Sequence, residues 1–253
     1  MSEQADGRES LSYFGHEVVP AEEKRRRVAG VFRSVARRYD LMNDLMSAGI
    51  HRLWKTSFIH TLDPRPGMRI LDVAGGTGDI AFRAHEAAGG KARIVVADLS
   101  EEMIGEGRRR AGQRGLRLDW VVAAAERLPF ADRRFDAYAI AFGIRNVGER
   151  AAALAEARRV LRFGGHFACL EFSKVAVPLL DRLYALYAHR VIPRLGELVA
   201  GDRESYQYLV DSIDRFPDPD SFADEIRAAG FGRVRYRLLS GGICAIHEGW
   251  RVT

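Results

Sequence analysis

Five short runs of apolar and β-branched residues alternate with helical stretches along the chain, and this alternation constrains the fold most. The runs are residues 68–74, 93–99, 118–124, 135–142 and 166–172. They lack polar alternation, which is typical of parallel strands buried by helices on both faces of a sheet. Amphipathic segments that fit helices lie between them, at residues 79–88, 101–114 and 149–161. Successive βα units of this kind predict a doubly wound, mostly parallel α/β sheet.

The two ends of the chain add to this sheet. Residues 218–229 predict a helix closed by Gly230, and the runs 234–239 and 242–247 are close enough for an antiparallel edge hairpin, which gives seven strands. We expect one Rossmann-like domain over residues 21–253, with a helical cap at 21–62, a helical insertion at 175–200 and a flexible start over residues 1–20. Within the cap, residues 21–39 have the apolar spacing of an amphipathic helix.

Composition narrows the class of protein. No uncharged run among the 253 residues approaches the ~18 that a spanning helix needs, and the polar start lacks the apolar core of a signal peptide. Cys169 and Cys244 have neither disulfide-framework nor metal-ligand spacing. We therefore expect a soluble cytoplasmic protein without a metal. The net charge of +5 comes mostly from arginine, which either reflects composition alone or serves contact with phosphate or anionic lipid.

A glycine loop follows the first strand of the predicted sheet. Gly76, Gly78 and Ala81 form G-x-G-x-x-A, and Asp98 ends the second strand about 20 residues later, where an acid that binds ribose is expected. This pattern fits NAD, and it also fits a turn without any ligand.

Two carboxylates around the loop favour a different cofactor. Asp79 opens the helix after the loop, where it would repel a pyrophosphate. S-adenosylmethionine has no phosphate and carries cationic sulfonium and amino groups, so Asp72 and Asp79 would favour it. S-adenosylmethionine is therefore the preferred cofactor, and an NAD oxidoreductase is the more distant alternative.

The stretch from Ala123 to Asp136 resembles the adenine-side loop and fourth strand of class I S-adenosylmethionine-dependent methyltransferases. Ala124 replaces the usual Asp or Asn, so backbone groups around Ala124 and Ala125 would have to hold the adenine. Leu99 and Met103 are the candidate apolar walls.

The residues after the fourth strand face the methyl acceptor in this class. Here they read Phe142-Gly143-Ile144-Arg145-Asn146-Val147. This segment lacks the Pro-Pro turn of enzymes that methylate base amines, and neither cysteine has the Pro-Cys context of pyrimidine C5 methylation. Nucleic acid is therefore not expected as a partner.

Several motifs together resemble the ubiquinone/menaquinone biosynthesis C-methyltransferase family, from about Phe14 to the C-terminus. They are Phe32 to Ser47 with Gly49 to Lys55, Leu71 to Asp79, Phe142 to Val147, Leu170 to Lys174, Tyr206 to Leu209 with Ser212-Ile213, and His247 to Gly249. The resemblance implies C-methylation of a polyprenylated quinol, either 2-polyprenyl-6-methoxy-1,4-benzoquinol or demethylmenaquinol. Its cofactor positions fall on Thr77, Asp98, Ala124 and Ala125. Family members often have Asn or Asp at Ala124 and Ser at Ala141.

The chemistry suggests roles for the acceptor segment. Ring methylation needs a phenolate, and the site must lower a phenol pKa of about 10. Arg145 is the candidate that stabilises the phenolate, and Asn146 would orient the ring oxygen or a water that receives the proton. Alternatively, both residues only cap the turn. His51 is the first candidate base, with three others in the N-terminal motif: Tyr39, Asp40 and Asn43.

Two segments are candidates for contact with lipid. Residues 175–199 have a broad apolar helical face with Arg182, Arg190 and Arg194, which indicates either a core helix or a lid for the polyprenyl chain. The basic residues between Lys24 and Arg38 could contact the inner face of the cytoplasmic membrane. A quinone-biosynthesis complex is a further candidate partner. The alternatives for function are another small-molecule or lipid methyltransferase and a non-catalytic cofactor-binding subunit of such a complex.

Overall fold

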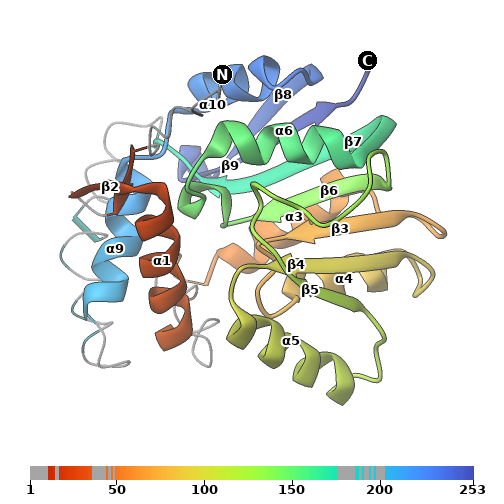
Figure 1. The fold of residues 1–253 in the computed structure, drawn as a ribbon, viewed down its shortest axis with the longest axis horizontal. Coiled ribbons are helices and arrows are strands. Elements are labelled where there is room, and N and C mark those ends of the chain that lie inside the picture. Colours follow the sequence, from red (N-terminus) through yellow and green to blue (C-terminus); the bar gives the residue numbers. More distant parts are fainter. Residues whose placement is uncertain are drawn as a thin grey trace, which may run out of the picture.

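A seven-stranded sheet is the centre of the computed structural model, which describes residues 11–14, 17–35, 44, 47, 49–175, 186, 187, 190, 194, 197 and 203–253. The strand order is β5-β4-β3-β6-β7-β9-β8 (Figure 1). The strands are β3 (Arg69–Val73), β4 (Arg93–Asp98), β5 (Asp119–Val122), β6 (Phe135–Ala141), β7 (Leu161–Phe172), β8 (Gly232–Leu239) and β9 (Cys244–Trp250). The first five pair in parallel, and β9 is antiparallel to β7 and β8. The predicted mostly parallel sheet with an antiparallel edge hairpin is confirmed.

Helices cover both faces of this sheet, as the uniformly apolar strands require. One face packs against α3 (His51–Leu62), α4 (Asp79–Ala87) and α5 (Glu101–Gln113). The other packs against α6 (Arg150–Val160) and α10 (Pro219–Ala228). The short 3-10 turns η2 (Ile144–Asn146) and η4 (Ser240–Gly242) follow β6 and β8. Two hydrophobic cores result, one on each face.

Side chains fix where these helices begin and end. Ser100 accepts a hydrogen bond from the Met103 N–H at the start of α5, and Asp218 does the same for Ser221 at the start of α10. Oxygen caps of this kind satisfy amides that have no partner within the helix. At the carboxyl end of α6, Arg251 donates to three backbone carbonyl groups, those of Arg158, Arg159 and Leu161.

An additional layer lies at the carboxyl edge of the sheet. It consists of a hairpin, β1 (Leu11–Phe14) and β2 (Glu17–Pro20), followed by α1 (Ala21–Val35) and α9 (Arg203–Asp214). Figure 1 shows α1 and α9 beside each other at this edge, and the two helices are in contact. The Phe14 ring of β1 stacks on Tyr208 of α9 with 4.3 Å between centroids. The hairpin and α9 thus enclose the same side of the molecule.

The sequence missed some of these elements. The hairpin occupies part of residues 1–20, for which only flexibility was expected, and α9 was not predicted. Strand β7 begins at Leu161 rather than at 166, because Leu161 pairs with Phe135 ahead of a register shift. The helix predicted to reach residue 39 is described as far as Val35, and most of the 175–200 insertion lies outside the described residues.

Gly143, which precedes η2, lies close to Ala74 in the neighbouring loop. A Cβ there would lie 2.4 Å from the Cβ of Ala74, at the end of β3. We expect Gly143→Ala to lower the free energy of unfolding by about 1–3 kcal/mol. Both Cβ atoms are attached directly to the backbone, so the backbone itself must shift to relieve the clash. Gly105→Ala in α5 meets nothing within 4 Å and is the control. It should raise stability by about 0.5–1 kcal/mol. Urea unfolding measures both, and equal effects would contradict the account.

Candidate functional site

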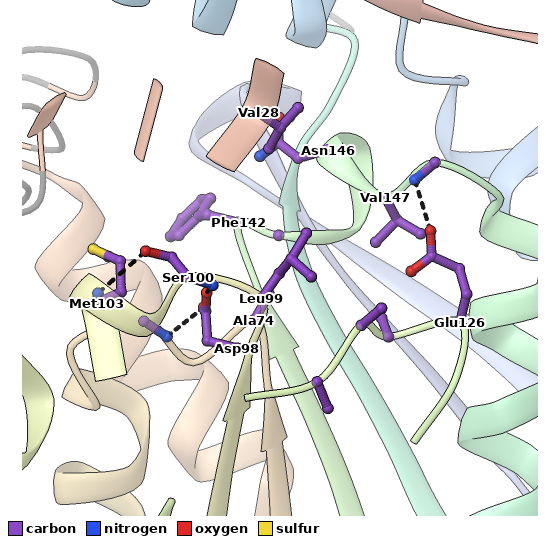
Figure 2. Close-up of a pocket in the computed structure, with 16 residues that line it drawn as sticks. Val28, Ala74, Asp98, Leu99, Ser100, Met103, Glu126, Phe142, Asn146 and Val147 are labelled. Atoms are coloured by element: carbon purple, nitrogen blue, oxygen red, sulfur yellow. Dashed lines mark hydrogen bonds between the residues drawn. The ribbon is translucent and has the colours of Figure 1, made fainter. Parts of the chain in front are cut away.

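A pocket of about 710 Å³ opens at the carboxyl ends of β3, β4 and β6. Ligands bind at this edge in doubly wound sheets. Figure 2 shows its lining, to which α1 contributes one side chain, Val28. The lining residues are Val28, Ala74, Gly76, Asp98, Leu99, Ser100, Met103, Ala123, Ala124, Ala125, Glu126, Phe142, Gly143, Asn146, Val147 and Gly148.

Asp98 organises the half of the pocket next to the glycine loop. One carboxylate oxygen accepts from the Gly76 N–H and the other from the Ser100 N–H, each at 2.8 Å. The carboxylate therefore joins the glycine loop to the start of α5. Burial raises the pKa of Asp98, while these backbone N–H groups act in the opposite direction. A carboxylate has about four acceptor positions, so it can still accept from ribose hydroxyl groups.

The segment after β5 contributes Ala124 and Ala125 to the pocket. Leu99 and Met103 also line it. The Ala124 carbonyl already accepts from the Arg127 N–H at 3.1 Å. The alanine side chains add no polar group, so these four residues offer backbone atoms and apolar walls to a flat heterocycle.

Four predicted cofactor residues do not line the pocket: Thr77, Gly78, Asp72 and Ala141. The buried Thr77 hydroxyl accepts a long hydrogen bond from Arg110 at 3.4 Å. Gly78 has φ +85° and begins α4 with no room for a Cβ beside the Trp120 ring. Burial raises the pKa of Asp72 to about 8, so this carboxyl is largely protonated at neutral pH. Thr77, Gly78 and Asp72 therefore belong to or adjoin the glycine loop without lining the pocket.

Asp79 forms ion pairs outside the pocket lining. Its carboxylate contacts Lys55 of α3 at 2.8 Å and Arg83 at 3.1 Å. Burial acts to raise its pKa, but these two cations outweigh burial and hold the pKa below its usual value. Two cations neutralise the charge of Asp79 away from the pocket lining, so in this structure the carboxylate is already paired and contributes little free charge near the pocket.

Arg145 points into the protein rather than toward the pocket. Its guanidinium donates to Glu171 at 2.6 Å, to the Phe142 carbonyl at 2.8 Å and to Ser212 at 3.2 Å. Glu171 lies within β7 and is 1% exposed, so it needs a cation beside it. Arg145 therefore does not line the pocket in this structure, and a direct role toward the acceptor stays a prediction. The alternative, that it holds the turn, describes its contacts.

Asn146 is the polar side chain of this turn that does line the pocket (Figure 2). Its Oδ1 accepts from the Tyr208 hydroxyl at 3.2 Å. Its buried Nδ2 has no hydrogen-bond partner among the described residues. A buried donor without a partner is rare in proteins and indicates a place for a ligand acceptor.

His51 lies elsewhere, in a second pocket of about 550 Å³. Its neighbours there are mostly cationic: Arg52, Arg83, Arg110 and Arg114, with Phe82 and Asp79. The His51 Nε2 is 2.8 Å from Asp44, and burial lowers the pKa of the ring. His51 does not line the first pocket, so the structure does not bring it to the acceptor segment, and its role as a base stays a prediction. Tyr39, Asp40 and Asn43 lie outside the described residues.

Two charged residues that the sequence analysis did not assign to the pocket join neighbouring segments to the turn. Lys24 of α1 is buried and donates to the Val147 carbonyl at 2.8 Å. Glu126 accepts from the Gly148 N–H at 3.0 Å. Burial lowers the pKa of Lys24 to about 8. Lys24 is the single lysine in an arginine-rich helix, which is a signal that could have identified it.

Among the described residues, no group of His, Cys, Asp or Glu has the arrangement of a metal site. None of the described helices is both long and apolar enough to cross a bilayer.

The contacts of Arg145 predict the effect of removing it. Arg145→Ala leaves Glu171 buried without its cation, so we expect a loss of about 3–5 kcal/mol in unfolding free energy. Arg145→Met combined with Glu171→Leu should recover most of that loss. Urea unfolding measures stability, and turnover is measured in parallel. A stable Arg145→Ala protein without turnover would instead restore the direct catalytic role.

Comparison with known proteins agrees with this geometry. Residues 20–251 match the model of the ubiE/COQ5 methyltransferase family. Proteins named ubiquinone/menaquinone biosynthesis C-methyltransferase UbiE from Methylobacterium nodulans and Paracoccus denitrificans are 60% and 56% identical. The alignments cover 96% and 95% of this chain, and 98% and 97% of those proteins.

Solved structures show the same fold at low sequence identity. A SAM-dependent methyltransferase from Aquifex aeolicus has a TM-score of 0.56 at 18% identity, over 78% of this chain and 89% of that one. Haemonchus contortus phosphoethanolamine N-methyltransferase 2, solved with S-adenosyl-L-methionine, has a TM-score of 0.59 at 12% identity, over 79% and 52%. With the match over residues 20–251, the chain belongs to the ubiE/COQ5 methyltransferase family.

Proposed function

We propose that this methyltransferase transfers a methyl group from S-adenosylmethionine to a ring carbon of a polyprenylated quinol. The substrate is 2-polyprenyl-6-methoxy-1,4-benzoquinol, demethylmenaquinol or both. One observation carries the proposal: the same pocket contains the Asp98 carboxylate at one side and, at another, the Asn146 Nδ2 donor, which has no partner among the described residues. The name of the relative that is 60% identical, a ubiquinone/menaquinone biosynthesis C-methyltransferase, supports the same reaction.

The pocket residues fit S-adenosylmethionine. Asp98 can accept from ribose hydroxyl groups, and Leu99, Met103 and the Ala124-Ala125 backbone can hold the adenine. A sulfonium methyl is already activated for transfer, which is the chemistry that the donor supplies when bound. The protonated state favoured for Asp72 by burial places no fixed negative charge directly behind the glycine loop.

The acceptor half of the pocket must make an aromatic carbon nucleophilic. An ionised ring hydroxyl does so, because its charge spreads onto the ring carbons. Asn146 Nδ2 can donate to that oxygen, which stabilises the phenolate and lowers the pKa of the hydroxyl. A water near Asn146 receives the proton. Phe142 and Val28 supply apolar walls that exclude other water and strengthen this hydrogen bond.

The donor and acceptor assignments are tested together. We expect the protein to bind S-adenosylmethionine and to methylate a reduced short-tail benzoquinol or naphthoquinol under anaerobic conditions. Asp98→Asn should weaken donor binding about 10-fold or more, because it removes a charged acceptor. Asp224→Ala, in an exposed ion pair with Arg227 on α10, is the control. Calorimetry measures binding, and mass spectrometry measures the methylated product.

Other outcomes distinguish the alternatives. Methylation of a different acceptor class alone would indicate another small-molecule or lipid methyltransferase. Binding of S-adenosylmethionine without any turnover would indicate a non-catalytic subunit of a quinone-biosynthesis assembly. Failure to bind the donor would overturn the cofactor assignment and favour NAD.

Collection of a polyprenylated substrate also requires access to lipid, so we include peripheral membrane contact at the cytoplasmic face in the proposal. Tyr13 and Val18 on the β1–β2 hairpin are 51% and 56% exposed. This hairpin adjoins the acceptor half through the Phe14–Tyr208 stack. The basic face of α1 carries less net positive charge than its sequence suggests, because Glu17 and Glu23 form ion pairs with Arg27.

Flotation with vesicles that contain anionic lipid tests the hairpin contact. Changing Tyr13 and Val18 together to Ser should reduce flotation and turnover of a long-tail quinol, while turnover of a short-tail quinol persists. Phe163→Ser is the matched control, since Phe163 is 52% exposed between two arginines at the amino-terminal part of β7. Equal flotation of all three proteins would contradict the contact.

A further inference from the structure

The Tyr208 hydroxyl has one described hydrogen-bond partner, the Asn146 side chain in the acceptor turn. It donates to Asn146 Oδ1 at 3.2 Å across 62 residues of sequence. One turn further along α9, Ser212 accepts from the Arg145 guanidinium at 3.2 Å. Helix α9 therefore contacts both polar residues of η2, each with a different side chain.

The direction of the Tyr208 hydrogen bond has a consequence for Asn146. A carboxamide has one accepting end and one donating end. Because Tyr208 occupies the accepting Oδ1, the donating Nδ2 is the end that stays without a partner among the described residues. Asn146 lines the pocket, so a ligand there meets a donor rather than an acceptor.

The surroundings of Tyr208 keep it a donor in a fixed position. Its ring is 5% exposed and stacks on Phe14 with an interplanar angle of 17°. Burial raises the pKa of Tyr208 well above its usual value, although Arg145 acts in the opposite direction. The hydroxyl thus keeps its proton across the pH range in which a quinol enzyme is assayed.

We propose that Tyr208 is a positioning residue that holds the Asn146 amide so that its N–H is available to the ring oxygen of the acceptor. This inference rests on the proposed function, since the ring oxygen is that of the quinol. Without the hydroxyl, the amide can turn over and present Oδ1, which repels a phenolate. Tyr208 then acts through Asn146 and not on the substrate itself.

Steady-state kinetics of Tyr208→Phe test the proposal. The variant keeps the ring and its stack on Phe14 but loses the donor. We expect kcat to fall about 10-fold, less than the 100-fold or more lost with a direct oxyanion donor, with unchanged affinity for S-adenosylmethionine. The pH profile of kcat should shift to higher pH, because the quinol hydroxyl ionises less readily. Tyr206→Phe is the matched control: it removes a hydroxyl two residues away on α9, where side chains do not share a face.

A double-mutant cycle separates positioning from an independent effect. If Tyr208 acts through Asn146, adding Tyr208→Phe to Asn146→Ala causes no further loss of kcat. Losses that multiply would overturn the proposal, as would wild-type kcat and pH profile in Tyr208→Phe.

If Tyr208→Phe is too unstable to assay, the NMR signal of the Asn146 side-chain amide in the wild type is the test. It should shift on binding a phenolate analogue, and an unchanged signal would overturn the proposal. If the wild type methylates no quinol, the proposed function fails instead.

Discussion

The buried ion pair between Arg145 and Glu171 is the interaction on which the candidate site depends. Both side chains are almost inaccessible, and removing two charges from water is costly unless they pair closely. Their 2.6 Å contact joins the turn after β6 to the neighbouring strand β7. An apolar pair could fill the same space, but it would not also bind the Phe142 carbonyl and Ser212. The pair therefore fixes one conformation of the turn.

The fixed turn is where the rest of the pocket is assembled. Asn146 faces the pocket. The Val147 carbonyl accepts from Lys24 of α1, and the Gly148 N–H donates to Glu126 of the loop after β5. The strand ends supply the half that fits the methyl donor, held by Asp98. The added layer of hairpin, α1 and α9 supplies contacts to the acceptor half. This division explains how a common sheet can carry a specialised acceptor site.

The sequence predicted the sheet well because its signal is local. Uniformly apolar runs identified the central strands, and glycines identified the turn at Gly76. The first hairpin was missed because its strands are four residues each and lie in a polar start. Strand β7 began early because Leu161 pairs with β6, which no local pattern shows.

The candidate site was predicted less completely, because side-chain direction depends on partners far along the chain. Arg145 has its partner 26 residues away, so no local pattern shows that its side chain points inward. A signal did exist, since Glu171 lies in an otherwise apolar strand and an acid there needs a cation. His51 was chosen for its pKa, but Asp44 and a cluster of arginines surround it in another pocket. Asp98, Ala124 and Ala125 do line the pocket, because they lie at or just after the carboxyl ends of β4 and β5; their contacts with a cofactor stay a prediction.

The central claim is that the acceptor oxygen meets Asn146 and not Arg145. A crystal structure with S-adenosylhomocysteine and a non-reactive phenolic analogue of the quinol tests it most directly. The account predicts the homocysteine product with its ribose at Asp98, the phenolic oxygen within hydrogen-bond distance of Asn146 Nδ2, and Arg145 still paired with Glu171. A phenolic oxygen bound by an Arg145 that has left Glu171 would contradict it.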